Sequence, residues 1–370
     1  MKVLVFCVFI ALASGSLAPL HRVSERVPGN YMVHIKKGLH LDDFIANSFS
    51  VSLEGQILHK YEHIGHGIAV RIPDHLVDVL RSLDGVEYVA EDGVVYTQQV
   101  ASWGLDRVDQ RYLPLDNIFT PPRTGSGTTI YVIDTGILHS HKDFGGRVTN
   151  LYDFEPGNNG ADCNGHGTHC AGTAAGSTFG VAKGADIKSV RFMGCTGSGL
   201  WTDMLDGLDL VVADITPTMQ KVASMSVGGG KNPFVDQYVA DAIAAGVVVS
   251  AAAGNSNANA CNYSPSGVLT AITVGATDDN DKRASYSNYG NCVDVFAPGT
   301  SIVSTWIDSD TSTYTLSGTS MACPHVSGAA ALLLERGVAP SNVPDEMVAT
   351  ATGVVTNPGS GSPNLMLYVN

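Results

Sequence analysis

The hydrophobic pattern first marks out the N-terminal end of the chain. An apolar run, Val3–Ala13, follows Lys2 and precedes a group of small residues. A basic start, an apolar run too short to cross a hydrocarbon layer of about 30 Å, and small residues behind it are typical of a secretory signal peptide. We therefore predict a signal peptide over residues 1–18 and a secreted, extracellular protein. No later stretch is apolar enough to suggest a membrane helix.

Residues 19–97 carry the pattern of a small α+β domain. Tyr31–Lys36 alternates like a strand, 41–49 suits a short helix, 56–72 a hairpin and 86–96 another strand. Between the last two, we place one more helix whose apolar face consists of Leu76, Val79, Leu80 and Leu83, with Asp74 as its N-cap. The order β-α-β-β-α-β is the ferredoxin-like pattern.

The pattern changes after residue 96. Short β-branched runs now alternate with Ala- and Gly-rich segments that suit helices, which predicts an α/β domain over residues 98–370. Continuous apolar strands indicate a parallel sheet with helices on both faces. The clearest strand runs are Thr129–Ile133, Val222–Val227, Val247–Ala251 and Ile272–Gly275.

Composition narrows the class of protein. Of 370 residues, 44% are hydrophobic and 15% charged, enough apolar material for large buried cores. The net charge of −14 disfavours nucleic acid and anionic membranes as partners, because both attract basic surfaces. Apart from Cys7 in the signal peptide, six cysteines remain, and secretion favours disulfides among them without fixing the pairs. These are Cys163, Cys170, Cys195, Cys261, Cys292 and Cys323.

Three motifs carry candidate chemistry. Asp134 ends an apolar strand, where α/β sheets place ligand sites. His166 lies between two glycines in Asn164–Thr173, ahead of small residues that allow close helix packing. Ser320 lies in Gly318–His325 at the start of an apolar helix, where the partial positive charge stabilises an oxyanion.

Each motif alone also has a plainer interpretation. Asp134 suits a turn cap and Ser320 an N-cap. The second motif also offers a set of sulfur and imidazole ligands that suggests zinc. However, structural zinc sites usually draw on two separated pairs, and a helix starting near His166 would turn the histidines away from the first cysteine. We therefore disfavour zinc, and with it a metallohydrolase. The zinc set would be Cys163, His166, His169 and Cys170.

Together, in the order Asp, His, Ser, the motifs resemble those of subtilisin-like serine proteases, specifically the proteinase K branch. The resemblance covers residues 103–370, and residues 19–97 look like the inhibitory propeptide of that family. Further matching segments are Trp103–Asp106, Gly180–Lys183, Ser224–Gly230, Ala252–Asn255, Asn262–Pro265, Ser285–Gly290 and the aqualysin-like Gly361–Asn364.

The resemblance implies a role for each residue. Ser320 is the nucleophile, His166 the general base and acid, and Asp134 the residue that orients His166. Asn255 matches the oxyanion-hole asparagine, and His169 and His325 match no catalytic role. Substrate is expected to pair as a strand with two backbone edges. The substrate-binding residues are Gly197, Ser198 and Gly199 on one edge, and Ser226, Val227, Gly228 and Gly229 on the other.

The implied primary pocket lies between Ser226–Gly229 and Ala252–Asn255. Its small, apolar walls predict a broad preference for apolar or aromatic residues. A kexin-like preference for paired basic residues would need acidic pocket residues that this segment lacks. The resemblance also implies disulfides Cys163–Cys195 and Cys261–Cys292, with Cys170 and Cys323 free.

Structural calcium is the predicted cofactor. Asp106, Asp109 and Gln110 share one face of a helical turn, with Asp116 nearby, and crowded carboxylates favour a hard cation. This stretch also resembles a calcium site of the aqualysin-type enzymes. The alternative is a solvated acidic face that pairs with Arg107 and Arg111. The resemblance implies a second site, formed by Asp294 with the backbone carbonyls of Leu269 and Ala271.

The sequence thus predicts a secreted serine endopeptidase, made as a zymogen with its own propeptide as inhibitor, acting as a monomer on proteins and peptides. We expect self-processing near Tyr96–Gln98. The alternative is a catalytically silent binding protein of the same fold. Such a protein usually lacks a catalytic residue, whereas this chain keeps all four of the matching residues, Asp134, His166, Ser320 and Asn255.

Overall fold

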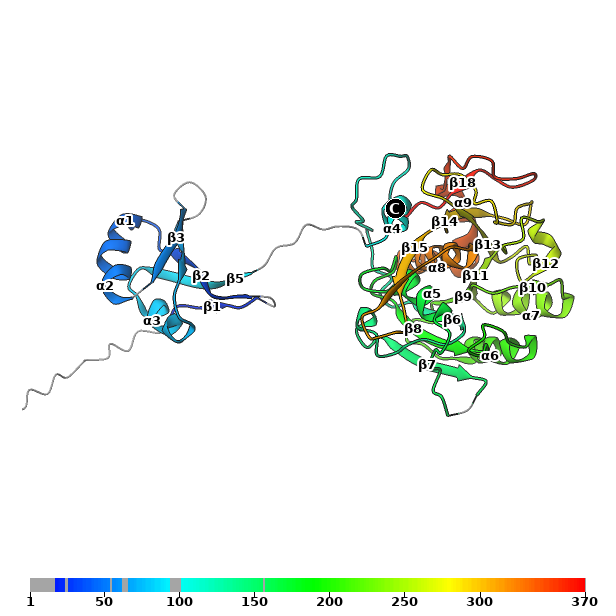
Figure 1. The fold of residues 1–370 in the computed structure, drawn as a ribbon, viewed down its shortest axis with the longest axis horizontal. Coiled ribbons are helices and arrows are strands. Elements are labelled where there is room, and N and C mark those ends of the chain that lie inside the picture. The colour runs from blue at the N-terminus through cyan, green and yellow to red at the C-terminus, as the bar shows by residue number, and fades with distance from the viewer. Residues whose placement is uncertain are drawn as a thin grey trace, which may run out of the picture. The chain divides into compact units, whose positions relative to one another are not determined.

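The computed structural model describes residues 17–23, 26–53, 55–61, 66–93, 101–155 and 157–369. The chain forms two compact units, Met1–Thr97 and Gln98–Asn370 (Figure 1). Almost all of the predicted signal peptide, and the predicted processing region near residues 96–98, lie outside the described residues. None of the described helices combines the length and apolar composition that a membrane crossing requires.

From residue 26 onward the smaller unit has the predicted ferredoxin-like order, and one short strand that was not predicted precedes it. Its sheet runs β1-β5-β2-β4-β3, and helices cover one face around a core that includes Ile35, Ile68 and Leu80. The strands are β1 (Leu20–His21), β2 (Arg26–Ile35), β3 (Gln56–Tyr61), β4 (Gly67–Arg71) and β5 (Val86–Gly93). The helical segments are α1 (Leu41–Phe44), a π-helical turn (Ile45–Phe49), α2 (Ser50–Ser52), a 3-10 turn (Asp74–Leu76) and α3 (Val77–Ser82).

Two local predictions in this unit were wrong. Val79 is 39% exposed, whereas Leu80 is fully buried, because the helix opens with a 3-10 turn that shifts its apolar face. Asp74 does not cap the helix. Its carboxylate instead accepts hydrogen bonds from Arg26 Nη2 (2.8 Å), Gly29 N (2.9 Å) and Tyr31 Oη (2.9 Å), donors that β2 brings within reach.

A nine-stranded sheet forms the centre of the larger unit, in the order β17-β18-β14-β13-β11-β9-β6-β8-β7. All neighbouring strands are parallel except β17 and β18. Two small antiparallel pairs, β10–β12 and β15–β16, lie outside it. The sheet strands are β6 (Thr129–Asp134), β7 (Val148–Asp153), β8 (Asp186–Arg191), β9 (Lys221–Met225), β11 (Val247–Ala252), β13 (Ile272–Thr277), β14 (Val295–Pro298), β17 (Thr352–Gly353) and β18 (Leu365–Met366). The paired strands are β10 (Gly229–Gly230), β12 (Tyr263–Ser264), β15 (Ile302–Thr305) and β16 (Thr313–Leu316).

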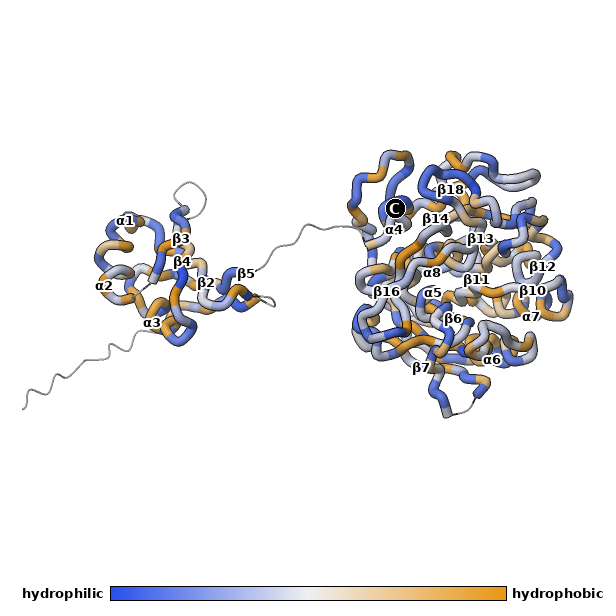
Figure 2. Tube along the Cα trace, in the orientation of Figure 1, coloured by the Kyte–Doolittle hydropathy of each residue, from blue (hydrophilic) through white to orange (hydrophobic). Residues whose placement is uncertain are grey.

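Helices cover both faces of this sheet. Along β6, Ile130 and Val132 pack toward the core that contains α5 and α8, and Tyr131 and Ile133 toward the core under α6 and α7. Figure 2 shows how hydrophobic and hydrophilic residues are distributed along the chain. The helices are α4 (Trp103–Val108), α5 (His166–Ala175), α6 (Trp201–Ala213), α7 (Pro233–Ala244), α8 (Thr319–Glu335) and α9 (Val343–Thr350), with 3-10 turns at Lys142–Phe144, Ala260–Asn262 and Pro340–Asn342.

Candidate active site

The candidate residues gather at one edge of the large sheet. Asp134 is the last residue of β6, and Gly197–Gly199 follow β8. Ser226 follows β9, and Asn255 follows β11. Because these strands are parallel, their carboxyl ends meet at the same edge, where open α/β sheets bind ligands.

Asp134 and His166 form a hydrogen-bonded pair. His166 Nδ1 lies 2.8 Å from Asp134 Oδ1 and 2.9 Å from Oδ2, and Asp134 is fully buried. The close approach of α5 to the strand end requires glycine at 167, where a Cβ would lie 2.3 Å from Gly136 O. Burial lowers the pKa of His166, but the buried Asp134 carboxylate outweighs it and raises the pKa well above its ordinary value.

Asp162, which we did not predict as a site residue, fixes the loop between the β6 end that carries Asp134 and the α5 start that carries His166. One carboxylate oxygen accepts from Thr135 Oγ1 and from the N–H groups of residues 164 and 165. The other accepts from Thr168 N and Oγ1. Thr135 Oγ1 in turn accepts from Gly167 N, so Asp162 ties the end of β6 to the start of α5.

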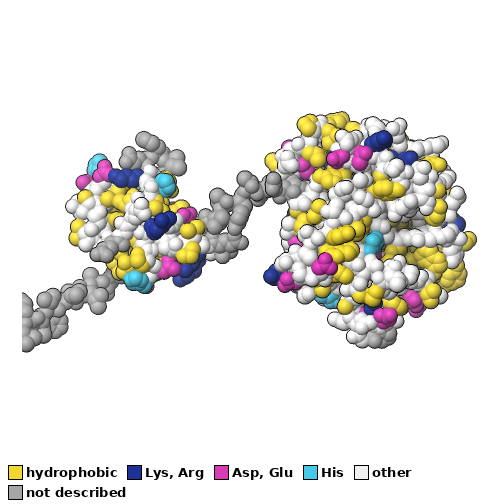
Figure 3. All heavy atoms as spheres, viewed as in Figure 1, with side chains coloured by type: hydrophobic (Ala, Val, Ile, Leu, Met, Phe, Trp, Pro, Cys, Tyr) yellow, Lys and Arg dark blue, Asp and Glu magenta, His cyan; other side chains and the backbone are white. Residues whose placement is uncertain are grey.

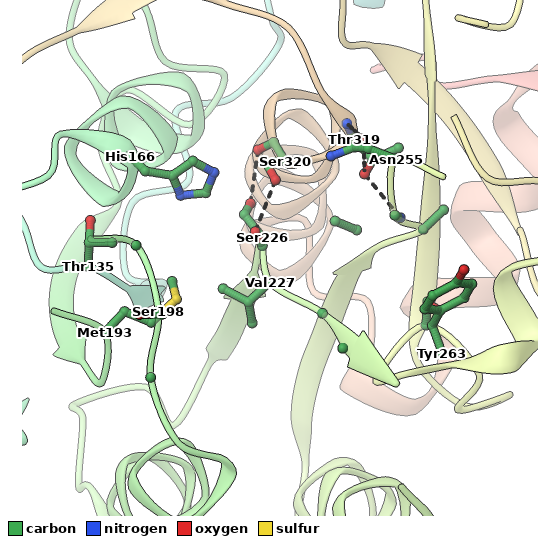
Figure 4. A pocket seen from close by; sticks show the side chains of 18 of the residues that line it. Thr135, His166, Met193, Ser198, Ser226, Val227, Asn255, Tyr263, Thr319 and Ser320 are labelled. Carbon is green, nitrogen blue, oxygen red and sulfur yellow. Dashed lines mark hydrogen bonds between the residues drawn. The ribbon is translucent and has the colours of Figure 1, made fainter. Parts of the chain in front are cut away.

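Ser320 lies in the first turn of α8 and faces the same hollow as His166 (Figure 4). Its hydroxyl donates to Ser226 O at 3.0 Å, and Ser226 Oγ donates to Ser320 O at 2.9 Å. Among the described residues, Ser320 Oγ has no hydrogen bond to His166. Catalytic hydrogen bonds often form only once substrate is bound. Without substrate, the Ser320 hydroxyl donates to the Ser226 carbonyl instead.

Asn255 lies beside the start of α8, and Thr319 sets its orientation. Asn255 Oδ1 accepts from Thr319 N at 2.8 Å and from Thr319 Oγ1 at 2.9 Å (Figure 4). Because a backbone N–H can only donate, the atom facing Thr319 is the amide oxygen. The Nδ2 group of Asn255 therefore remains available as a donor next to Ser320.

A cleft of about 640 Å³ joins these residues to both predicted substrate edges. No Asp, Glu, Lys or Arg is among its lining residues, and on the face shown in Figure 3 most of the surface of the larger unit is uncharged. Besides His166, Ser320 and Asn255, the cleft is lined by Gly197, Ser198, Gly199, Ser226, Val227, Gly228, Gly229, Ala252, Ala253 and Gly254, with Met193, Trp201 and Tyr263 further along.

Of the four residues of the alternative zinc site, His166 and Cys170 lie together beside Asp134, and the other two are engaged elsewhere. Cys163 is bonded to Cys195, and His169 is buried with Nε2 at 3.1 Å from Ile302 O. Burial lowers the pKa of His169 to about 4, so its ring is neutral. His325 is buried too, with its Nδ1 2.9 Å from Met321 O, and burial lowers its pKa to about 4.

Two disulfides join Cys163 to Cys195 and Cys261 to Cys292, the pairs that the resemblance implies. Cys170 and Cys323 are free and buried. The Cys170 sulfur lies 3.4 Å from Ser320 O and 3.9 Å from His166 Nδ1. Burial raises the pKa of both thiols, that of Cys323 to about 11, so both are neutral thiols.

The candidate calcium ligands divide into two places. Near α4, Asp109 Oδ2 accepts from Thr120 N at 2.7 Å, but Asp109 Oδ1 is buried without a hydrogen-bond partner among the described residues. Burial raises the pKa of Asp109 to about 6. Asp106 accepts from Asp116 N and from the N–H of residue 117, and Gln110 Oε1 also accepts from Asp116 N. Among the described residues, these acids do not form a group whose ligand atoms all lie within 4.8 Å of one another.

The two arginines of the alternative interpretation do not neutralise these acids. Arg107 is fully buried and pairs with Asp281 at 2.6 Å, and Arg111 contacts Thr350 O and the ring of Tyr368. At the second place, the Asp294 carboxylate accepts from Thr273 N at 2.8 Å, next to the segment that contains Leu269 and Ala271. Burial raises the pKa of Asp294 to about 6.

A parallel sheet that gathers an aspartate, a histidine and a serine at its carboxyl edge is the architecture of an α/β serine hydrolase. Residues 125–364 match the model of the "Subtilase family", and residues 30–98 match that of "Peptidase inhibitor I9".

Individual relatives agree with this class. The chain is 50% identical over 328 residues to the extracellular serine proteinase of Thermus sp. (strain Rt41A), covering 86% of this chain and 79% of the relative. It is 40% identical over 354 residues to proteinase R of Parengyodontium album, covering 94% and 90%. A solved cold-adapted subtilisin-like serine proteinase superposes with a TM-score of 0.70 at 45% identity, covering 74% of this chain and 99% of that one. The chain therefore belongs to the subtilase family of serine peptidases and carries an I9 inhibitor domain ahead of the peptidase domain.

Proposed function

We propose that this chain is the zymogen of a secreted, monomeric serine endopeptidase with the triad Asp134, His166 and Ser320. The Asp134–His166 bond at 2.8 Å, in the same hollow as a serine at a helix start, carries the proposal. A silent binding protein of the same fold would not need this hydrogen bond, in which the buried Asp134 carboxylate raises the pKa of the histidine that acts as base.

The residues divide the reaction between them. When substrate enters, Ser320 Oγ leaves Ser226 O, passes its proton to His166 Nε2 and attacks the scissile carbonyl. Asp134 holds the Nδ1–H tautomer and stabilises the imidazolium. His166 then gives the proton to the leaving amine, and water releases the acyl group by the reverse steps. Asn255 Nδ2 and the Ser320 N–H stabilise the negative oxygen of the tetrahedral intermediate.

Substrate binds as an extended strand between Gly197–Gly199 and Ser226–Gly228. Both segments line the cleft, and main-chain pairing gives affinity for many sequences. The pocket between Ser226–Gly229 and Ala252–Asn255 has small walls without charge, which supports a broad preference for apolar or aromatic side chains.

We further propose that calcium stabilises the mature enzyme. The residues suit a hard cation in their chemistry, although they are not gathered as a ligand group: among the described residues Asp109 Oδ1 is buried without a hydrogen-bond partner, and Arg107 pairs with Asp281 rather than with these acids. Asp106, Asp109, Gln110 and Asp116 would hold one ion, and Asp294 with the Leu269 and Ala271 carbonyls a second. When bound, calcium would supply positive charge to these carboxylates.

Ser320→Ala tests the function. We expect the variant to remain an uncleaved proprotein, because the same site cuts its own junction near Tyr96–Gln98, and to lose labelling by a fluorophosphonate. Ser317→Ala, an exposed serine three positions earlier, should mature and label like the wild type. N-terminal sequencing and labelling with and without a zinc chelator give the readouts. Maturation of Ser320→Ala expressed without other proteases would refute self-processing, and an unlabelled wild type would refute the triad.

A further inference from the structure

Asn288 lies under the loop that carries Asn255. That loop, Ala253–Ala258, follows β11 without regular secondary structure, and Asn255 in its middle is exposed. Asn288 is completely buried. It borders the cleft only from beneath this loop and exposes no surface to a substrate.

The side chain of Asn288 bonds the loop on both sides of Asn255. Its Oδ1 accepts from Ser256 N at 3.0 Å and from Ala258 N at 2.9 Å, and its Nδ2 donates to Ala253 O at 2.8 Å. The backbone N–H of Asn288 donates to Gly254 O at 2.8 Å. Four hydrogen bonds thus fix the residues that flank Asn255, and none of them involves Asn255 itself.

The loop backbone at Gly254 packs closely against the side-chain amide of Asn288. Its φ of +100° is one that L side chains rarely adopt, and a Cβ there would lie 2.5 Å from Asn288 Nδ2. Gly254 N also donates to Thr319 Oγ1, the hydroxyl that contacts Asn255 Oδ1. The loop is therefore held by Asn288 from beneath and by Thr319 from the nucleophile helix.

An oxyanion donor must lie about 2.7–3.1 Å from the position that the negative oxygen will take, and it gains most when it is fixed there beforehand. An asparagine on an exposed, irregular loop does not meet this condition by itself. We propose that Asn288 is a positioning residue for the oxyanion donor: it clamps the Asn255 loop in the geometry that the transition state requires, without touching substrate. This proposal rests on the proposed function of the same site.

The test uses the mature enzyme, with kcat expressed per fluorophosphonate-titrated site. Asn288→Ser shortens the side chain and removes the amide contacts. We expect kcat to fall about 10- to 100-fold, the scale of a misplaced catalytic group, with KM changed less than about twofold. Asn280→Ser is the matched control. It makes the same change at an exposed asparagine outside this loop, whose side-chain amide donates to Asp279, so kcat should be unchanged.

A double-mutant cycle separates positioning from general loosening. If Asn288 acts through Asn255, adding Asn288→Ser to Asn255→Ala should lower kcat less than about twofold further. An equal loss in both backgrounds would overturn the proposal, as would a loss confined to KM. If Asn288→Ser does not fold, Asn288→Asp keeps the size and the acceptor atom, and the same cycle applies. Failure of the wild type to label would instead refute the proposed function.

Discussion

Asn255 presents its amide donor to the cleft because Thr319 occupies its oxygen. We expect Asn255→Ala to lower kcat by about 100- to 1,000-fold, the usual cost of removing one oxyanion donor, with little change in KM. Steady-state kinetics on a peptide substrate measures both constants. A loss mainly in KM would mean that Asn255 shapes the pocket instead.

The protonation of His166 sets a second residue-level prediction. Only the neutral ring accepts the proton of Ser320, so activity is lost as pH falls through the pKa of His166. Because Asp134 raises that pKa, the acid limb of kcat/KM should have its midpoint above the ordinary value of about 6.5. Asp134→Asn removes the negative charge and should move the midpoint downward, in a pH–rate profile of the surviving activity. A wild-type midpoint below 6.5 would contradict this account.

The candidate triad and Asn255 were predictable because their motifs have characteristic neighbours and a fixed order. Asp162 and Asn288 were not, although the structure gives each several hydrogen bonds to loop backbone. An Asp or Asn in such a segment looks like an ordinary turn residue in the sequence, and only the folded chain shows that Asp162 also accepts from Thr135 and that Asn288 accepts from Ser256 and Ala258. The hydrogen bond from Ser320 Oγ to Ser226 O was not predictable either, because it joins residues that are far apart in the sequence.

At the level of elements, apolar runs located the central strands closely, since a strand buried on both faces must be apolar throughout. The run 222–227 extended too far, because β9 ends at Met225 and the next residues leave the sheet and line the cleft. Helix details were less predictable. The π-helical turn at Ile45–Phe49 and the 3-10 start at Asp74–Leu76 cannot be told from an α-helix by sequence periodicity.

The two disulfides should differ in effect because they tie different elements. Cys163–Cys195 joins the loop before α5 to the loop that contains Gly197–Gly199, where Asn164 Nδ2 also donates to Cys195 O. Its loop spans 32 residues and that of Cys261–Cys292 spans 31, so each should contribute roughly 3–4 kcal/mol by chain entropy.

We therefore expect the double variant Cys163→Ala, Cys195→Ala to raise KM as well as to unfold more readily. Cys261→Ala, Cys292→Ala should lose similar stability with KM nearly unchanged, which makes it the matched control. Thermal inactivation and KM on one peptide substrate measure the two effects. Equal KM values in both variants would show that the first disulfide does not hold the substrate edge.

At the scale of the whole molecule, calcium should raise thermal stability, because it binds the folded state and not the unfolded chain. At a hundredfold excess over Kd, one ion adds about 2.7 kcal/mol. We expect EDTA to shorten the thermal half-life of the mature enzyme relative to millimolar Ca²⁺, and Asp109→Asn to reduce that difference. Asp308→Asn, an exposed acid without a predicted ligand role, is the control. An unchanged wild-type half-life in EDTA would refute calcium, and equal shortening in wild type and Asp109→Asn would refute only the first site.

The pair of backbone edges in the cleft also bears on which proteins this enzyme can digest. A strand that pairs along both edges must first leave its own secondary structure, so the chemistry of the target's side chains matters less than its freedom to detach a segment. For folded targets, the cutting rate should follow the equilibrium population of locally opened chain. Cleavage would then report the local flexibility of the target, with unstructured linkers cut first and tightly folded cores last.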